Sequence, residues 1–136
     1  MKRYLLDSNA VSALISRRPP FADRVREARS RGDRIGTCEP VIAELFFGLE
    51  FSSSREENAV RLRRALSQIK SWPFNRAAAQ AFGQIAAELR RRGRPMQVID
   101  IMVGAITLTL PQGIVVSSDG DLRAIPGLTV ENWADA

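Results

Sequence analysis

Two carboxylic acids stand alone inside strongly apolar stretches of the sequence. Glu44 lies within Val-Ile-Ala-Glu-Leu-Phe-Phe (41–47), and Asp100 lies within Val-Ile-Asp-Ile-Met-Val (98–103). An ionised carboxylate that is buried without a partner costs several kcal/mol, so such a residue needs a cation, hydrogen-bond donors or a route to water. Local explanations are also open: Asp100 could accept backbone N–H bonds in its helix's first turn, and Glu44 could face water from a helix edge.

Two further acids follow short apolar runs that are typical of buried strands. Asp7 comes directly after 3–6, and Asp119 comes shortly after 114–117. In α/β folds the carboxyl ends of the strands meet where sites form, so both acids should lie at that edge. Four carboxylates from four separate elements have a common purpose if they converge on a divalent metal.

The residue types that are absent narrow the chemistry. The chain has no histidine and a single cysteine, Cys38, which excludes Ser-His-Asp and Cys-His nucleophiles, histidine zinc sites and an intrachain disulfide. It also lacks a phosphate-binding loop and a dinucleotide fingerprint. Carboxylates without imidazole or thiolate suit hard cations such as Mg²⁺ or Mn²⁺. Such a metal would activate water and offset charge on a phosphoryl oxygen, which is how a nuclease works without histidine.

Length and composition limit the number of domains and the place of the protein in the cell. With 136 residues, 45% of them hydrophobic, the chain is expected to be one domain over 1–136. No stretch approaches the roughly 20 apolar residues of a membrane-spanning helix. The acid at position 7 comes too early for a signal peptide, so we expect a cytoplasmic protein without a membrane partner.

Arginine dominates the positive charge. The net charge is +5, and 18 of the 20 basic residues are arginine. This bias favours phosphate contacts but also follows from a GC-rich genome. An arginine-rich exterior is typical of a solvated surface as much as of a binding one, and helix-end capping is a further alternative for the denser second cluster. The candidates for RNA contact are Arg17, Arg18, Arg90, Arg91, Arg92 and Arg94.

Periodicity indicates alternating strands and helices. Right-handed crossovers then predict an α/β fold with a central parallel sheet and helices on both faces. Strands are expected over 3–6, 34–37, 114–117 and 128–131, with a link or strand over 72–74. Helices are expected over 10–16, 21–31, 40–51, 54–70, 75–92 and 98–110, with a helical turn over 119–124 and with Pro19-Pro20 stopping the first helix.

The order of these motifs resembles a known family. Leu-Leu-Asp-Ser-Asn (5–9), Ala-Glu-Leu with Gly48, Gly-Arg-Pro (93–95) followed by Asp100, and Ser-Ser-Asp-Gly-Asp-Leu (117–122) are similar to motifs of the PIN-domain ribonucleases. Within that family they resemble the VapC toxins of bacterial toxin–antitoxin pairs. The match spans the whole chain in order, although Leu122, Gly104 and Gly120 depart from the usual residues.

The resemblance implies a PIN-like three-layer sandwich and a metal-dependent endoribonuclease. Its substrate would be structured RNA, commonly tRNA. Its partners would be a second copy, forming a homodimer, and a VapB-type antitoxin whose C-terminal segment covers the acidic groove. Carried over by position, the resemblance makes Asp7, Glu44, Asp100 and Asp119 the residues that hold one or two Mg²⁺ or Mn²⁺ ions, with Ser8, Asn9, Ser117 and Asp121 in support.

Two other functions remain open at this stage. A non-catalytic RNA-binding domain with the same fold would be expected to lose one or more acids, whereas this chain keeps all four. A metal-dependent DNA or flap nuclease would share the acidic site but usually needs longer insertions. Between the last two acids, we expect Asp119 to be nearest the metal and Asp121 to cap the short helical turn or to give secondary support.

Overall fold

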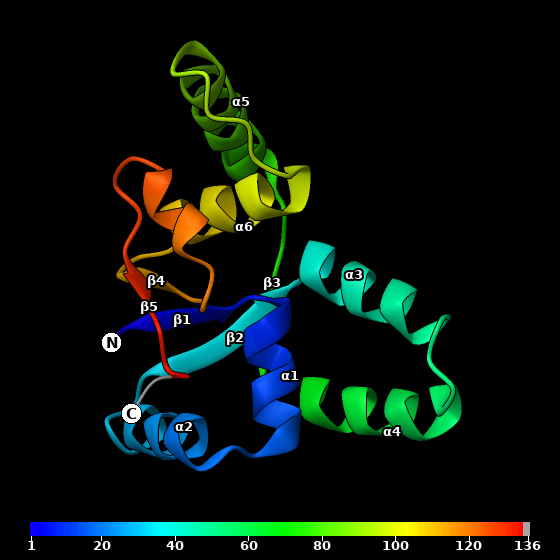
Figure 1. The fold of residues 1–136 in the computed structure, drawn as a ribbon. Coiled ribbons are helices and arrows are strands. Elements are labelled where there is room, and N and C mark those ends of the chain that lie inside the picture. The colour runs from blue at the N-terminus through cyan, green and yellow to red at the C-terminus, as the bar shows by residue number, and fades with distance from the viewer. Residues whose placement is uncertain (135–136) are drawn as a thin grey trace.

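Among residues 1–134, which the computed structural model describes, five strands form one parallel sheet (Figure 1). The order across the sheet is β3-β2-β1-β4-β5, which makes the first strand of the chain the central one. The strands are β1 (Arg3–Leu6), β2 (Arg34–Cys38), β3 (Lys70–Trp72), β4 (Gly113–Val116) and β5 (Val130–Glu131).

The central strand is apolar because both of its faces are covered. Tyr4, Leu5 and Leu6 are each at most 1% exposed, as is typical of parallel strands with helices on both sides. Leu6 pairs with Val116 of β4. The carboxyl ends of these two strands therefore lie side by side, which places the residues that follow them at one edge of the sheet.

Helices cover both faces of the sheet, so the predicted three-layer α/β architecture is confirmed. In Figure 1, α5 and α6 lie on one side, α1 and α2 lie on the other, and α3 and α4 project together as an arm. The helices are α1 (Ser8–Ser16), α2 (Pro19–Ser30), α3 (Glu39–Leu49), α4 (Arg55–Leu66), α5 (Arg76–Arg91) and α6 (Val98–Thr109), with a 3₁₀ turn η1 (Gly120–Ala124).

Several predicted boundaries are wrong for identifiable reasons. The two prolines do not merely stop α1 but begin α2, because proline is well tolerated in the first turn of a helix. Helix α4 ends at Leu66, and Lys70 opens a strand instead. Ser54, the residue that precedes α4, makes no side-chain cap bond.

Two glycines are explained by close packing. A Cβ on Gly36 of β2 would lie 2.7 Å from the carbonyl oxygen of Lys70 and from the ring of Trp72, so glycine lets β3 pack beside β2. A Cβ on Gly104 would lie 2.5 Å from the Ile125 side chain. Glycine at position 104, where the family usually has another residue, thus lets Ile125, which follows η1, pack closely on α6.

No helix in residues 1–134 is both long and apolar enough to cross a membrane.

Candidate active site

Asp7 stands at the junction of β1 and α1. Its Oδ1 accepts a hydrogen bond from the backbone N–H of Ala10 at 2.9 Å, which caps the helix, and its residue exposure is only 8%. Burial raises the pKa of this carboxyl, and the charges of Asp119 and Glu44 add to the rise, whereas hydrogen bonds from Ser117 and Ala10 oppose it. Asp7 therefore combines a structural cap with a position inside a group of acids.

Glu44 reaches the same group from α3. The Ser8 hydroxyl donates a hydrogen bond to Glu44 Oε1 at 2.6 Å. Ser8 is the first residue of α1 and Glu44 is half-buried in the middle of α3. This bond joins two helices and fixes the carboxylate, so Glu44 does not simply face water from the edge of its helix.

Asp100 lies in the first turn of α6 and is half-buried. Within residues 1–134 its carboxylate accepts no hydrogen bond and pairs with no cation, so the capping role considered for it is absent. Burial raises its pKa most, followed by the charges of Asp119, Glu44, Asp7 and Asp121. Asp100, whose carboxylate has no hydrogen-bond or cationic partner in residues 1–134, therefore lies close to the other acids.

Asp119 and Asp121 differ in their contacts at the short turn. Asp119 Oδ1 accepts the backbone N–H of Asp121 at 2.9 Å, so Asp119 is the residue that caps η1. Asp121 instead is exposed and pairs with Arg94 at 3.3 Å. Of the two roles considered for Asp121, the cap belongs to Asp119 instead, because the side chain preceding the turn is the one in reach of its free N–H groups. The secondary support of the site by Asp121 stays a prediction.

The two serines expected in support each contact a carboxylate. Ser117 hydrogen-bonds Asp7 through its side chain, and its Oγ accepts the backbone N–H of Asp119 at 2.9 Å. It thereby links the residues that follow β1 and β4. Ser8 does the same for α1 and α3 through Glu44.

We call Asp7, Glu44, Asp100 and Asp119 the acidic cluster. In the described part of the chain none of the four forms a salt bridge, while Asp7 and Asp100 feel the charges of the others. As the side chains lie, no three acidic, histidine or cysteine side chains of residues 1–134 are placed to hold one ion. Mg²⁺ is usually held by one or two carboxylates and keeps several waters. The oxygen donors fit such a hydrated cation, although they do not form a closed cage.

The arginines predicted to contact RNA divide into two groups. Arg17 and Arg18 are exposed between α1 and α2. In the second group, Arg91 pairs with Glu88, Arg92 donates to the carbonyl oxygen of Ala124 at 2.6 Å, and Arg94 pairs with Asp121. These contacts favour the alternative that the second group anchors the end of α5 and the 3₁₀ turn; Arg90 is exposed.

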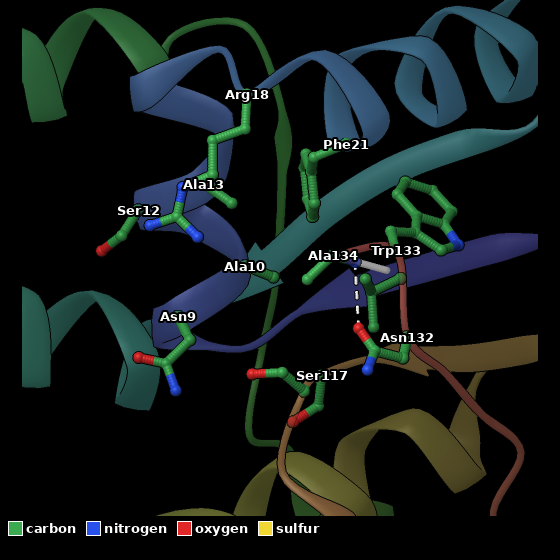
Figure 2. A pocket seen from close by; sticks show the side chains of 12 residues that line it. Asn9, Ala10, Ser12, Ala13, Arg18, Phe21, Ser117, Asn132, Trp133 and Ala134 are labelled. Atoms are coloured by element: carbon green, nitrogen blue, oxygen red, sulfur yellow. Dashed lines mark hydrogen bonds between the residues drawn. The ribbon is translucent and has the colours of Figure 1, made fainter. Parts of the chain in front are cut away.

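A small pocket of about 160 Å³ adjoins the acidic cluster (Figure 2). Its lining includes Ser117, which contacts Asp7 and Asp119 of the cluster, and it extends along α1 from Asn9 to Ser12. Sequence reasoning missed most of this pocket, because Ser12, Ser118 and the segment 132–134 meet only through tertiary packing. The one sequence signal is the spacing of Asn9 and Ser12, which places both on one face of α1.

Comparison with known proteins decides the family, since the PIN domain profile matches residues 4–128. The chain belongs to the PIN domain family. Among curated PIN relatives, the tRNA(fMet)-specific endonuclease VapC of Shigella flexneri is 29% identical, covering 98% of this chain and 100% of the relative. Ribonuclease VapC2 of Rickettsia felis is 25% identical, covering 96% of this chain and 97% of the relative. The resemblance to VapC toxins is therefore confirmed.

Solved structures agree with this assignment. DNA-bound VapBC from Salmonella typhimurium matches with a TM-score of 0.87 and 26% identity, over 98% of this chain and 99% of that one. VapBC2 from Rickettsia felis, bound to a DNA fragment from its promoter, matches with a TM-score of 0.88 and 22% identity, over 96% and 98%. The parallel sheet and the helices around it are thus those of the VapBC structures.

Proposed function

We propose that this PIN protein is a metal-dependent endoribonuclease of the toxin type, which cuts structured RNA such as tRNA in the cytoplasm. The observation that carries the proposal is the acidic cluster: four carboxylates from four elements stand together without a compensating cation in residues 1–134. The ribonuclease names of the VapC relatives support the reaction class.

The residues that would hold Mg²⁺ or Mn²⁺, directly or through its waters, are those of the acidic cluster. When bound, the cation would lower the pKa of water and offset negative charge on the phosphoryl oxygens. Ser117 holds Asp7 in place and fixes the backbone before Asp119. Ser8 keeps Glu44 turned toward α1. These hydroxyls position the two carboxylates.

The test is hydrolysis of a tRNA pool by the purified chain with Mg²⁺, with Mn²⁺ and with EDTA. We expect cleavage with either metal and none in EDTA. Asp100→Asn should cost about two to three decades of rate, the loss seen when one electrostatic contributor to a transition state is removed. Asp23→Asn, the same change at an exposed site on α2, is the control and should retain full rate.

The same assay separates the rival functions. RNA binding without cleavage would favour a non-catalytic domain, and faster cleavage of duplex or flap DNA would favour a DNA nuclease. Efficient cleavage of RNA in EDTA would contradict the metal-dependent mechanism.

We also propose a VapB-type antitoxin as partner, as the VapBC titles of the structural neighbours suggest. A groove of about 740 Å³ runs between α1, α2 and α4. Its floor includes Leu14, Ile15 and Val25, and its basic lining residues are Arg17, Arg26, Arg29, Arg61 and Arg64. In the described part of the chain, Asp23 is the one acid that lines it. The charge therefore suits an acidic amphipathic segment of the antitoxin.

A further inference from the structure

The pocket beside the acidic cluster combines a buried apolar floor with a polar rim. Ala10, Ala13, Phe21 and Trp133 are at most 5% exposed and form the floor. The rim consists of hydroxyl, amide and guanidinium groups from three segments of the chain, namely Asn9, Ser12, Arg18, Ser117, Ser118 and Asn132. Figure 2 shows the Arg18 side chain extending along α1 toward Asn9.

The size and charge of the pocket restrict what it can hold. At about 160 Å³ it is smaller than the roughly 300–1,000 Å³ of sites for drug-sized ligands, so it suits one small ring. Among residues 1–134, the lining contains no acid and one cation, Arg18, which disfavours a metal ion or a multiply charged phosphate group. Amides offer both a donor and an acceptor, as the edge of a nucleobase does.

The rim is arranged by the protein itself. The amide oxygen of Asn132 accepts the backbone N–H of Ala134 at 2.9 Å, which fixes that side chain. Ser117 is fixed by Asp119 and by its contact with Asp7. The Phe21 and Trp133 rings lie with their centroids 5.5 Å apart, so the floor is rigid. A preorganised polar rim favours discrimination between ligands, because mispaired polar groups are costly there.

We propose that this pocket receives one unpaired nucleobase of the RNA, next to the phosphodiester that is cut. Asn9 and Ser12 read the edge of the base, and Arg18 contacts the phosphate of the same nucleotide. The inference rests on the proposed ribonuclease function and adds to it the determinant of the cleavage site. Recognition of RNA sequence generally targets unpaired bases through their hydrogen-bonding edges.

The first test measures how much a base in the pocket contributes to the cleavage rate. Single-turnover cleavage is compared for short RNAs in which each nucleotide flanking the cut is, in turn, normal or abasic. For wild type, removing one base should lower kcat/KM about tenfold. Ser12→Leu fills the pocket from the exposed face of α1, so this variant should cleave normal and abasic RNAs with the same kcat/KM. Ser16→Leu, the same change one turn further along α1 and outside the pocket, should keep the penalty for a missing base.

A pair of neighbouring arginines gives a second matched comparison. Arg18→Asn and Arg17→Asn remove the same charge, and asparagine tolerates the left-handed conformation of Arg17 (φ 54°). Only Arg18 lines the pocket. We expect Arg18→Asn to raise KM for normal and abasic RNAs alike, because a phosphate contact is independent of the base, and Arg17→Asn to leave KM unchanged.

A binding measurement separates this proposal from the nuclease function. Nucleoside 5′-monophosphates are titrated into the metal-free protein while the indole N–H signals of Trp133 and Trp72 are followed by NMR. The Trp133 signal should shift, the Trp72 signal should not, and Ser12→Leu should abolish the shift. Cleavage without any abasic penalty, or an equal penalty in Ser12→Leu, would overturn the base pocket and leave the nuclease. A Trp133 shift with no cleavage of any RNA would overturn the nuclease, and with it the role of the pocket in cleavage.

Discussion

At the scale of single residues, the structure distinguishes two acids that are only two positions apart. Asp119 caps η1 and raises the pKa of Asp100 through its charge, whereas Asp121 pairs with Arg94 on the surface. We expect Asp119→Asn to lose most activity with its stability kept or raised, because asparagine caps as well as aspartate and one repulsive charge is removed.

Asp121→Asn should retain measurable activity with a shifted metal requirement. Both variants are assayed across Mg²⁺ and Mn²⁺ titrations, with thermal unfolding as the control for folding. An inactive Asp121→Asn together with a nearly normal Asp119→Asn would show that the metal-proximal acid has been assigned to the wrong position.

The raised pKa values of Asp7 and Asp100 predict a pH dependence of stability. Each carboxyl holds its proton more tightly in the folded chain than in the unfolded chain, so the folded state binds more protons above the ordinary pKa near 4. This contribution to stability is fully present below that pKa and is lost as the pH rises through the raised values.

In EDTA, Asp100→Asn should therefore gain thermal stability over wild type as the pH rises from about 4 toward neutrality. Adding Mg²⁺ at neutral pH should stabilise wild type more than the variant, since binding to the folded state alone shifts the equilibrium. A difference in Tm between the two proteins that stays constant from acid to neutral pH would contradict this account.

At the scale of elements, one hydrogen bond ties α1 to α3 within the site. Ser8→Ala removes the donor to Glu44, so we expect about 1 kcal/mol of lost stability and roughly a tenfold lower cleavage rate, because Glu44 is no longer held. Ser8→Thr keeps a hydroxyl and should restore both. Single-turnover rates and denaturant unfolding of the two variants check this, and an unchanged rate in Ser8→Ala would show that Glu44 needs no positioning.

The elements also show where sequence reasoning succeeds. The central strand and the Asn75 cap of α5 were predictable, because a buried apolar run and a cap are local signals; the Asn75 oxygen accepts the N–H of Ala78 at 3.0 Å. The start of α2 was not predictable in the same way, since proline both ends and begins helices. Pocket residues such as Ser12 and Asn132 meet only after β5 has docked beside β4, which no local pattern encodes.

At the scale of the whole molecule, the arm formed by α3 and α4 exposes an aromatic pair. Phe47 and Phe51 are 67% and 76% exposed, with ring centroids 5.2 Å apart, whereas Phe46 packs partly against the core and under Arg63. Large exposed apolar groups mark association surfaces. We expect a two-fold homodimer that uses this pair.

The oligomeric state is checked by light scattering, which measures the molar mass of the purified protein at tens of micromolar without antitoxin. Wild type should be a dimer and the double variant Phe47→Ser, Phe51→Ser a folded monomer. Leu108→Ser, at an exposed apolar residue of α6, is the control and should remain dimeric. A wild-type monomer would overturn the expectation.

The placement of the first strand at the centre of the sheet has a consequence for biosynthesis. β1 is made before its partner β4 and Asp119, which follow more than a hundred residues later along the chain. Contacts between segments so distant in sequence form late in folding. A ribosome-bound chain therefore carries Asp7 and Glu44 for much of its synthesis without Asp119 to complete the acidic cluster. The acidic cluster can therefore be completed only after β4 and Asp119 have left the ribosome, and a partner can bind the earlier segments before that point.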